Sequence, residues 1–113
     1  MTRVCFQLQV LPSLINEYRA AHEAVWPEML QAILDSGRRN YSLFLGDDGL
    51  LIGYYETDSV EASQEALRQD PRTALWESTM SRFFAEDHSR PDQAAKALTE
   101  IFNLNQQITK DQQ

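Results

Sequence analysis

Four side chains of this sequence could act together on a small polar molecule: Tyr18, His22, Tyr41 and Trp76. Tyr18 and His22 are four residues apart, so on a helix they share one face, one turn apart. Histidine exchanges protons near neutral pH, and phenolic hydroxyls bond the hydroxyls of a ligand. An indole such as that of Trp76 covers an apolar C–H face. These residue types suit a carbohydrate whose protons are moved by the histidine.

Each of these residues also has a purely structural interpretation. A single histidine on a helix is most often a half-exposed surface residue. Tyr18 fits the core with its hydroxyl at the surface, and the spacing of Trp76, Met80 and Phe83 is typical of a core-facing stripe. The spacing by itself leaves both interpretations open.

The histidines and the cysteine do not predict a metal site. His22 and the glutamate after it begin like a zinc-protease motif, but Trp26 occupies the position that needs the second histidine. The other histidine, His88, lies in a predicted loop, and Cys5 is the single cysteine, so no disulfide within the chain is possible. No phosphate-binding Gly-rich loop or serine nucleophile elbow is present. We therefore expect chemistry without a metal or cofactor.

The composition is that of an acidic globular protein. The 113 residues include 17 acidic and 10 basic side chains, for a net charge of −7. Such a charge repels nucleic acid and anionic lipid, so neither is an expected partner, whereas a neutral substrate is compatible with it. The first residues carry no apolar signal region, and no apolar run approaches membrane-spanning length. We expect a cytoplasmic protein.

The first half of the chain reads as a strand followed by helix. Apolar and polar residues alternate over Val4–Val10, which is the period of a strand with one buried face. A helical stretch follows, roughly over Leu14–Ser36, which Pro27 should kink or divide because proline lacks the N–H donor. Gly37 is a natural helix stop.

A hairpin and a second helix follow. Asn40–Leu45 and Leu50–Thr57 read as strands, and the Gly-Asp-Asp-Gly sequence at 46–49 carries the turn chemistry of a hairpin. A capping box over 58–61 predicts a helix that begins at Asp58 and runs to Arg68.

The last third predicts one more helix and one more strand. Asp70 is placed as an N-cap and Pro71 as the first residue of the next helix. A polar loop is expected over 85–92 and a last strand over Thr99–Leu104. The polar tail at 105–113 is expected to fray.

These elements give a β-α-β-β-α-β order, which is the ferredoxin-like α+β arrangement. We expect one domain over residues 1–104, with helices on one face of an antiparallel sheet. Phe44, Tyr54 and Phe102 make the other face too apolar to stay in water. A second copy packed sheet against sheet would cover it, which predicts a homodimer in the form of a dimeric α/β barrel.

The run from Glu17 to Glu28 resembles the L-rhamnose mutarotase family, in which a tyrosine, and a histidine four residues later, precede Trp-Pro-Glu. Three other segments resemble the same family: Asn40–Leu45, Trp76 with Met80, and Thr99–Leu104. The resemblance covers about residues 3 to 104. It implies that His22 is the proton donor and that Tyr18, Tyr41 and Trp76 contact the sugar.

The resemblance implies a mutarotase, an isomerase that interconverts the α and β anomers of a 6-deoxy hexose by ring opening and reclosure. Two departures leave the sugar open between L-rhamnose and a relative such as L-fucose: Glu77 stands where the family often has a second tryptophan, and Asn103 replaces an aromatic residue or histidine. The general base is a water or a neighbouring carboxylate. Alternatives on the same fold are a cofactor-independent monooxygenase, a lactone isomerase and a non-catalytic small-molecule-binding barrel.

Overall fold

A computed structural model describes residues 1–84 and 95–111 of the chain, with side chains up to residue 108. The elements in chain order are β1 (Thr2–Gln9), η1 (Pro12–Leu14), α1 (Ile15–Ala21), α2 (Pro27–Asp35), β2 (Arg39–Leu45), β3 (Leu50–Thr57), α3 (Val60–Gln69), α4 (Pro71–Met80), η2 (Ser81–Phe83), β4 (Lys96–Leu98) and α6 (Leu104–Asp111).

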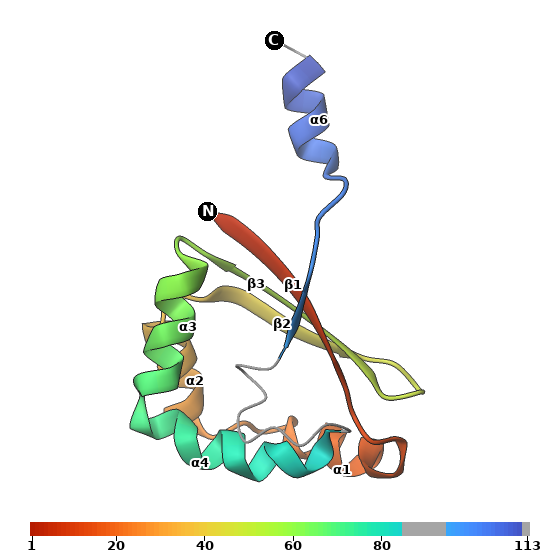
Figure 1. Cartoon of the computed structure of the whole chain (residues 1–113), viewed down its shortest axis with the longest axis vertical. Helices are drawn as coiled ribbons and strands as arrows, with labels where there is room; N and C mark the ends of the chain where they lie inside the picture. Colours follow the sequence, from red (N-terminus) through yellow and green to blue (C-terminus); the bar gives the residue numbers. More distant parts are fainter. Residues whose placement is uncertain (85–94, 112–113) are drawn as a thin grey trace.

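The strands form an antiparallel sheet in the order β2-β3-β1-β4. This is the ferredoxin-like α+β topology, so the predicted fold class is confirmed. Helices α2, α3 and α4 lie on one side of the sheet (Figure 1). The predicted loop at 85–92, with His88, lies outside the described residues.

The hairpin is the element that the sequence predicted best. β3 spans the predicted residues, and β2 begins one residue early, at Arg39. Gly49 has φ +91°, and a Cβ there would meet the Val10 carbonyl oxygen at 2.2 Å, so glycine is required for the turn to approach β1.

Proline and cap residues set the helix boundaries. Pro27 is the first residue of α2 and divides the predicted helical stretch, as expected. Asp70 caps α4 by accepting a hydrogen bond from the Arg72 N–H at 2.9 Å. The predicted start at Asp58 is wrong: Ser59 is the N-cap of α3, because its Oγ accepts from the Ala62 N–H.

The C-terminal segment differs from the prediction. The fourth strand is Lys96–Leu98 rather than Thr99–Leu104. Beyond Leu98 the chain is held to β1 by a side-chain ion pair between Glu100 and Arg3, at 2.8 Å, rather than by a backbone ladder. Phe102 is therefore not a strand residue, and it is 60% exposed.

The predicted fraying tail contains a helix, α6. Asn103 begins it, since its Oδ1 accepts from the Gln106 N–H at 3.0 Å. Hence Asn103 acts as a cap in this structure. The helix extends away from the body of the molecule (Figure 1).

The core lies between the sheet and helices α1, α2 and α4. It contains Val10, Tyr18, Met29, Leu51, Trp76, Met80, Phe83 and Phe84. None of the helices in the described part of the chain combines the length and apolarity needed to cross a membrane.

Candidate active site

A cavity of about 480 Å³ opens between the helices and the sheet. All four residues singled out in the sequence line it: Tyr18, His22, Tyr41 and Trp76. They come from α1, from the residue that ends α1, from β2 and from α4. The volume lies within the ordinary range of small-molecule sites.

His22 is fixed in the cavity by its own helix and by aromatic rings. Its Nδ1 lies 2.9 Å from the Tyr18 carbonyl oxygen. Because a carbonyl can only accept, Nδ1 carries the proton of this bond, and Nε2 is left for a ligand. The imidazole lies 4.3 Å from the Tyr18 ring and 5.5 Å from the Trp76 ring, centre to centre.

Tyr18 is a buried phenol rather than a base. Its side chain is 5% exposed, and burial, with smaller contributions from Tyr41 and Glu77, raises the pKa of Tyr18 well above its usual range. The hydroxyl therefore stays protonated at cellular pH and can donate as well as accept a hydrogen bond.

A β-bulge orients Tyr41. One extra residue of β2 is accommodated between the pairs Arg39–Glu56 and Ser42–Tyr54, and Asn40 adopts φ +51° there. Asparagine tolerates this left-handed conformation better than most residues. Tyr41 and Tyr55 both line the cavity as a result, with stacked rings 5.4 Å apart.

Trp76 lies at the same end of the cavity as His22 and is itself packed by Trp26, whose ring is 5.0 Å away and edge-on. Trp76 is 6% exposed and belongs to the core cluster. The functional and the structural interpretation of its stripe are therefore compatible, because a core residue also borders the cavity.

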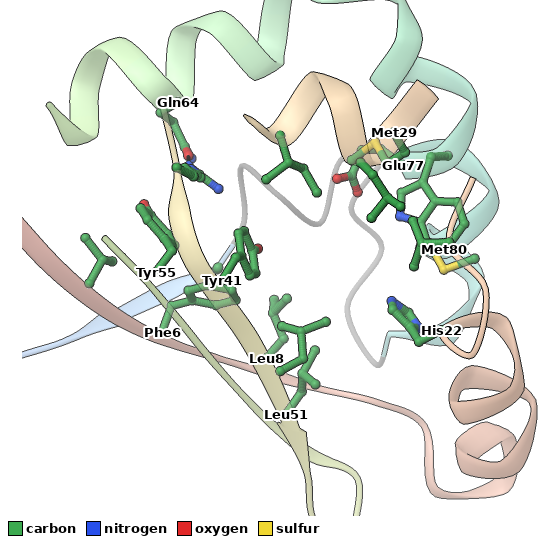
Figure 2. A pocket seen from close by; sticks show the side chains of 18 of the residues that line it. Phe6, Leu8, His22, Met29, Tyr41, Leu51, Tyr55, Gln64, Glu77 and Met80 are labelled. Atoms are coloured by element: carbon green, nitrogen blue, oxygen red, sulfur yellow. Dashed lines mark hydrogen bonds between the residues drawn. The ribbon is translucent and has the colours of Figure 1, made fainter. Parts of the chain in front are cut away.

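Several polar cavity residues could not be found from sequence spacing. Glu77 is 6% exposed, and its carboxylate points into the cavity (Figure 2). Arg38 and Gln64 line the cavity near Tyr55, where the Arg38 guanidinium lies 4.0 Å from the Tyr55 ring centre. Of these three residues, only Glu77 was indicated by the sequence, through its departure from the family pattern. Arg38 lies in the α2–β2 connection and Gln64 lies in α3, and neither belongs to a motif.

Metal ligands are not gathered here. Within residues 1–84 and 95–111, no group of three or more His, Cys, Asp or Glu side chains is arranged to hold a metal ion.

The model of the L-rhamnose mutarotase family matches residues 3–104. The chain belongs to the L-rhamnose mutarotase family. Relatives include the L-rhamnose mutarotase of Pectobacterium carotovorum, 33% identical over 108 residues that cover 93% of this chain and all of the relative. Another is the L-rhamnose mutarotase of Jannaschia sp., 29% identical over 92% of this chain and 99% of the relative.

Solved structures agree on the fold. The crystal structure of an L-rhamnose mutarotase from Formosa agariphila superposes with a TM-score of 0.74 at 20% identity, covering 92% of this chain and 99% of that one. A putative antibiotic biosynthesis monooxygenase from Nitrosomonas europaea gives 0.58 at 12% identity, covering 88% and 89%. These likenesses show a shared fold, which hosts more than one activity.

Proposed function

We propose that this member of the L-rhamnose mutarotase family interconverts the α and β anomers of L-rhamnose, with His22 as the proton donor and Tyr18, Tyr41 and Trp76 as sugar contacts. The observation that carries the proposal is the convergence of these four residues, from three separate elements, on one cavity. The family's relatives bear the same activity in their names.

The reaction needs two proton transfers and no redox change. An acid protonates the ring oxygen while a base removes the proton of the anomeric hydroxyl. The bond between the anomeric carbon and the ring oxygen breaks, an aldehyde forms and rotates, and reclosure on its other face gives the other anomer. Nothing in this sequence of steps calls for a cofactor.

His22 is placed to act through Nε2. Nδ1 is engaged with the Tyr18 carbonyl, so the imidazolium form would donate from Nε2 to the ring oxygen. The Tyr18 hydroxyl, kept protonated by burial, would bond a sugar hydroxyl, and the Trp76 indole would cover a C–H face.

Glu77 is the carboxylate that suits the base. Among the described residues, two carboxylates line the cavity: Glu61, which is exposed, and Glu77, which is 6% exposed. A partly desolvated carboxylate near Trp76 is better placed to accept the anomeric proton than an exposed one.

We further propose that the enzyme acts as a cytoplasmic homodimer. The sheet face away from the helices carries apolar residues, including Phe44, Ile52, Tyr54 and Leu98, and Phe44 is 63% exposed. A second copy packed on this face would cover them.

Saturation-transfer NMR on the purified protein tests the activity. Adding the protein should speed exchange between the two anomeric proton signals of L-rhamnose, with D-glucose as a comparison sugar. Exchange of L-rhamnose at the buffer rate would refute the proposed reaction.

A further inference from the structure

Arg38 is a buried cation that forms no ion pair with any of the described residues. It is 3% exposed and lines the cavity. Its contacts are neutral: Nε donates to Ser63 Oγ at 3.2 Å, and Nη2 donates to Gln64 Oε1 at 2.5 Å. Its guanidinium carbon lies 4.0 Å from the Tyr55 ring centre and 5.9 Å from that of Tyr41. In the part of the chain that the structure describes, no carboxylate forms an ion pair with it.

This arrangement is unusual for a chain so rich in carboxylates. The protein carries a net charge of −7, and Arg3, Arg68, Arg72 and Arg82 all pair with acidic side chains near the surface. A buried charge without an opposite partner is strongly destabilising. An arginine kept in this state beside a cavity therefore indicates that the counter-charge comes from a ligand.

The free donors of Arg38 match a carboxylate. A guanidinium has five N–H groups in one plane, of which Nε and one N–H of Nη2 are used. No fully buried side-chain nitrogen or oxygen among the described residues lacks a hydrogen bond, so Nη1, which makes none there, borders open space. Nη1 and the second N–H of Nη2 form the edge that binds a carboxylate through two parallel hydrogen bonds.

Arg38 lies on the side of the cavity away from His22 and Glu77, the residues proposed to transfer protons. His22, Glu77 and Met80 lie on one side of the cavity in Figure 2, Gln64 and Tyr55 lie on the other, and Tyr41 lies between them. Arg38 contacts the Gln64 and Tyr55 side. A ligand that spans the cavity would place one end at His22 and the other at Arg38.

The charges around the cavity favour a monoanion. Among the described residues that line the cavity, Arg38 is the one lysine or arginine, and the carboxylate residues Glu61 and Glu77 line it as well. A dianion such as a phosphate ester would be repelled by these two carboxylates, whereas one carboxylate needs one guanidinium. Recognition is local, since screening limits the effect of distant charges to about 8–10 Å.

We propose that the cavity binds aldoses that carry a carboxylate at the carbon farthest from the anomeric centre, the uronic acid class. The carboxylate lies on Nη1 and Nη2 of Arg38, and the anomeric carbon lies at His22. The assignment of the anomeric carbon to His22 rests on the proposed mutarotase function, while the anion site rests on Arg38.

Matched sugar pairs test the anion site by binding alone. L-Mannose and L-mannuronate share the ring stereochemistry of L-rhamnose and differ from it only at C6. D-Galactose and D-galacturonate form a second pair that does not depend on that stereochemistry. Affinity is measured by calorimetry, with tryptophan fluorescence as a second readout because Trp76 borders the cavity.

At least one uronate should bind about tenfold or more tightly than its neutral partner, since hydrogen bonds to a charged group are among the strong ones. The preference should shrink with added NaCl and fall to about twofold in Arg38→Gln. Arg38→Lys keeps the positive charge but lacks the two parallel N–H donors of the guanidinium, so its preference for the uronate should be intermediate. Arg39→Gln removes the same charge from an exposed neighbour outside the cavity lining and should keep the preference.

Equal binding of both members in both pairs, or a preference that survives in folded Arg38→Gln, would overturn the proposal. If neither Arg38 variant folds, the salt dependence of the wild-type preference decides: a preference unchanged by salt overturns it. L-Rhamnose exchange measured in parallel keeps the two proposals distinct. Uronate binding without exchange refutes the mutarotase, and exchange without a uronate preference refutes the anion site.

Discussion

The two nitrogens of the His22 ring have different tasks because one of them is already engaged. The bond from Nδ1 to the Tyr18 backbone carbonyl is made within α1 and its C-cap, so the position of His22 at the end of this helix orients its ring, whatever the side chain at position 18. The Tyr18 side chain contributes separately, through its ring 4.3 Å from the imidazole, centre to centre.

His22→Gln should leave the fold intact and remove the proton transfer. His22 is half-buried and lies outside the core cluster, so its loss costs little packing. The protein-dependent rate of anomer exchange should fall by about 10²-fold or more. A folded variant with the wild-type rate would show that another group is the acid.

Glu77→Gln tests the base. Glutamine keeps the shape of the side chain and removes its ability to accept a proton, so the exchange rate should fall by about 10²-fold while L-rhamnose still binds. Glu61→Gln is the matched control, since Glu61 lines the same cavity but is exposed, and its rate should stay near wild type. An unchanged rate in Glu77→Gln would assign the base to water.

The raised pKa of Tyr18 predicts a stability that falls in alkali. In the unfolded chain the phenol ionises near its usual pKa of 10.0, whereas the buried phenol resists ionisation. Stability is therefore complete below pH 10 and decreases above it, by about 1 kcal/mol at pH 11. Urea unfolding from pH 8 to 11 should show this loss, and Tyr18→Phe should show less of it. If the free energy of unfolding falls equally with pH in the two proteins, the loss of stability does not come from Tyr18.

At the scale of the elements, local rules predicted the parts that depend on neighbouring residues. Proline at the start of α2, the Asp70 cap and the turn before β3 are fixed by a few adjacent side chains and were read correctly. β4 was misplaced because strand propensity does not reveal which segment finds a partner, and Ala97, not Phe102, pairs with Phe6. The bulge at Asn40 and the position of Arg38 depend on contacts across the fold, which no spacing encodes.

Gly53 is a small residue that the fold requires in a strand. It pairs with Phe6 across β3 and β1, and a Cβ at Gly53 would lie 2.1 Å from the Phe6 ring. Phe6 also contacts Tyr41 and Tyr55 with ring centres 6.1 Å away. The glycine thus makes room for the ring that supports both cavity tyrosines.

Gly53→Ala should cost about 1–3 kcal/mol of unfolding free energy, because Phe6 cannot move without displacing the tyrosines. In a Phe6→Leu background the same substitution should cost less, which a double-mutant cycle measures. Gly46→Ala is the control, since its Cβ would come no closer than 3.0 Å to a neighbouring atom, Asp48 Oδ1, and should cost about 1 kcal/mol or less. Equal costs at the two glycines would contradict the role of Phe6.

At the scale of the whole molecule, one sheet face and the C-terminal segment carry apolar groups that this chain leaves in water. Phe44 pairs with Ile52, and Tyr54 pairs with Cys5, which in turn faces Leu98, so the apolar residues run across all four strands of the described sheet. Ile101 is 92% exposed and Phe102 60% on the segment that leads to α6, outside the body of the molecule (Figure 1). A two-fold dimer that packs this sheet face against its copy would remove the apolar residues of the face from water.

Phe44→Asp should therefore convert the protein to a monomer, because it puts a charge on the sheet face that two copies would bury, at its most exposed large apolar side chain. A stable interface of this kind removes about 800 Å² per partner from water, and an unpaired carboxylate within it opposes association. Light scattering after size exclusion at micromolar concentration gives the mass directly. Leu75→Asp is the matched control: Leu75 is 65% exposed on α4, on the helical layer, and its variant should remain dimeric. If wild type is a monomer, or if Phe44→Asp stays a dimer, the sheet face is not the interface. If the wild type is a dimer and Phe44→Asp remains one, the apolar segment around Ile101 is the part of the surface to test next, by the same measurement on Ile101→Asp.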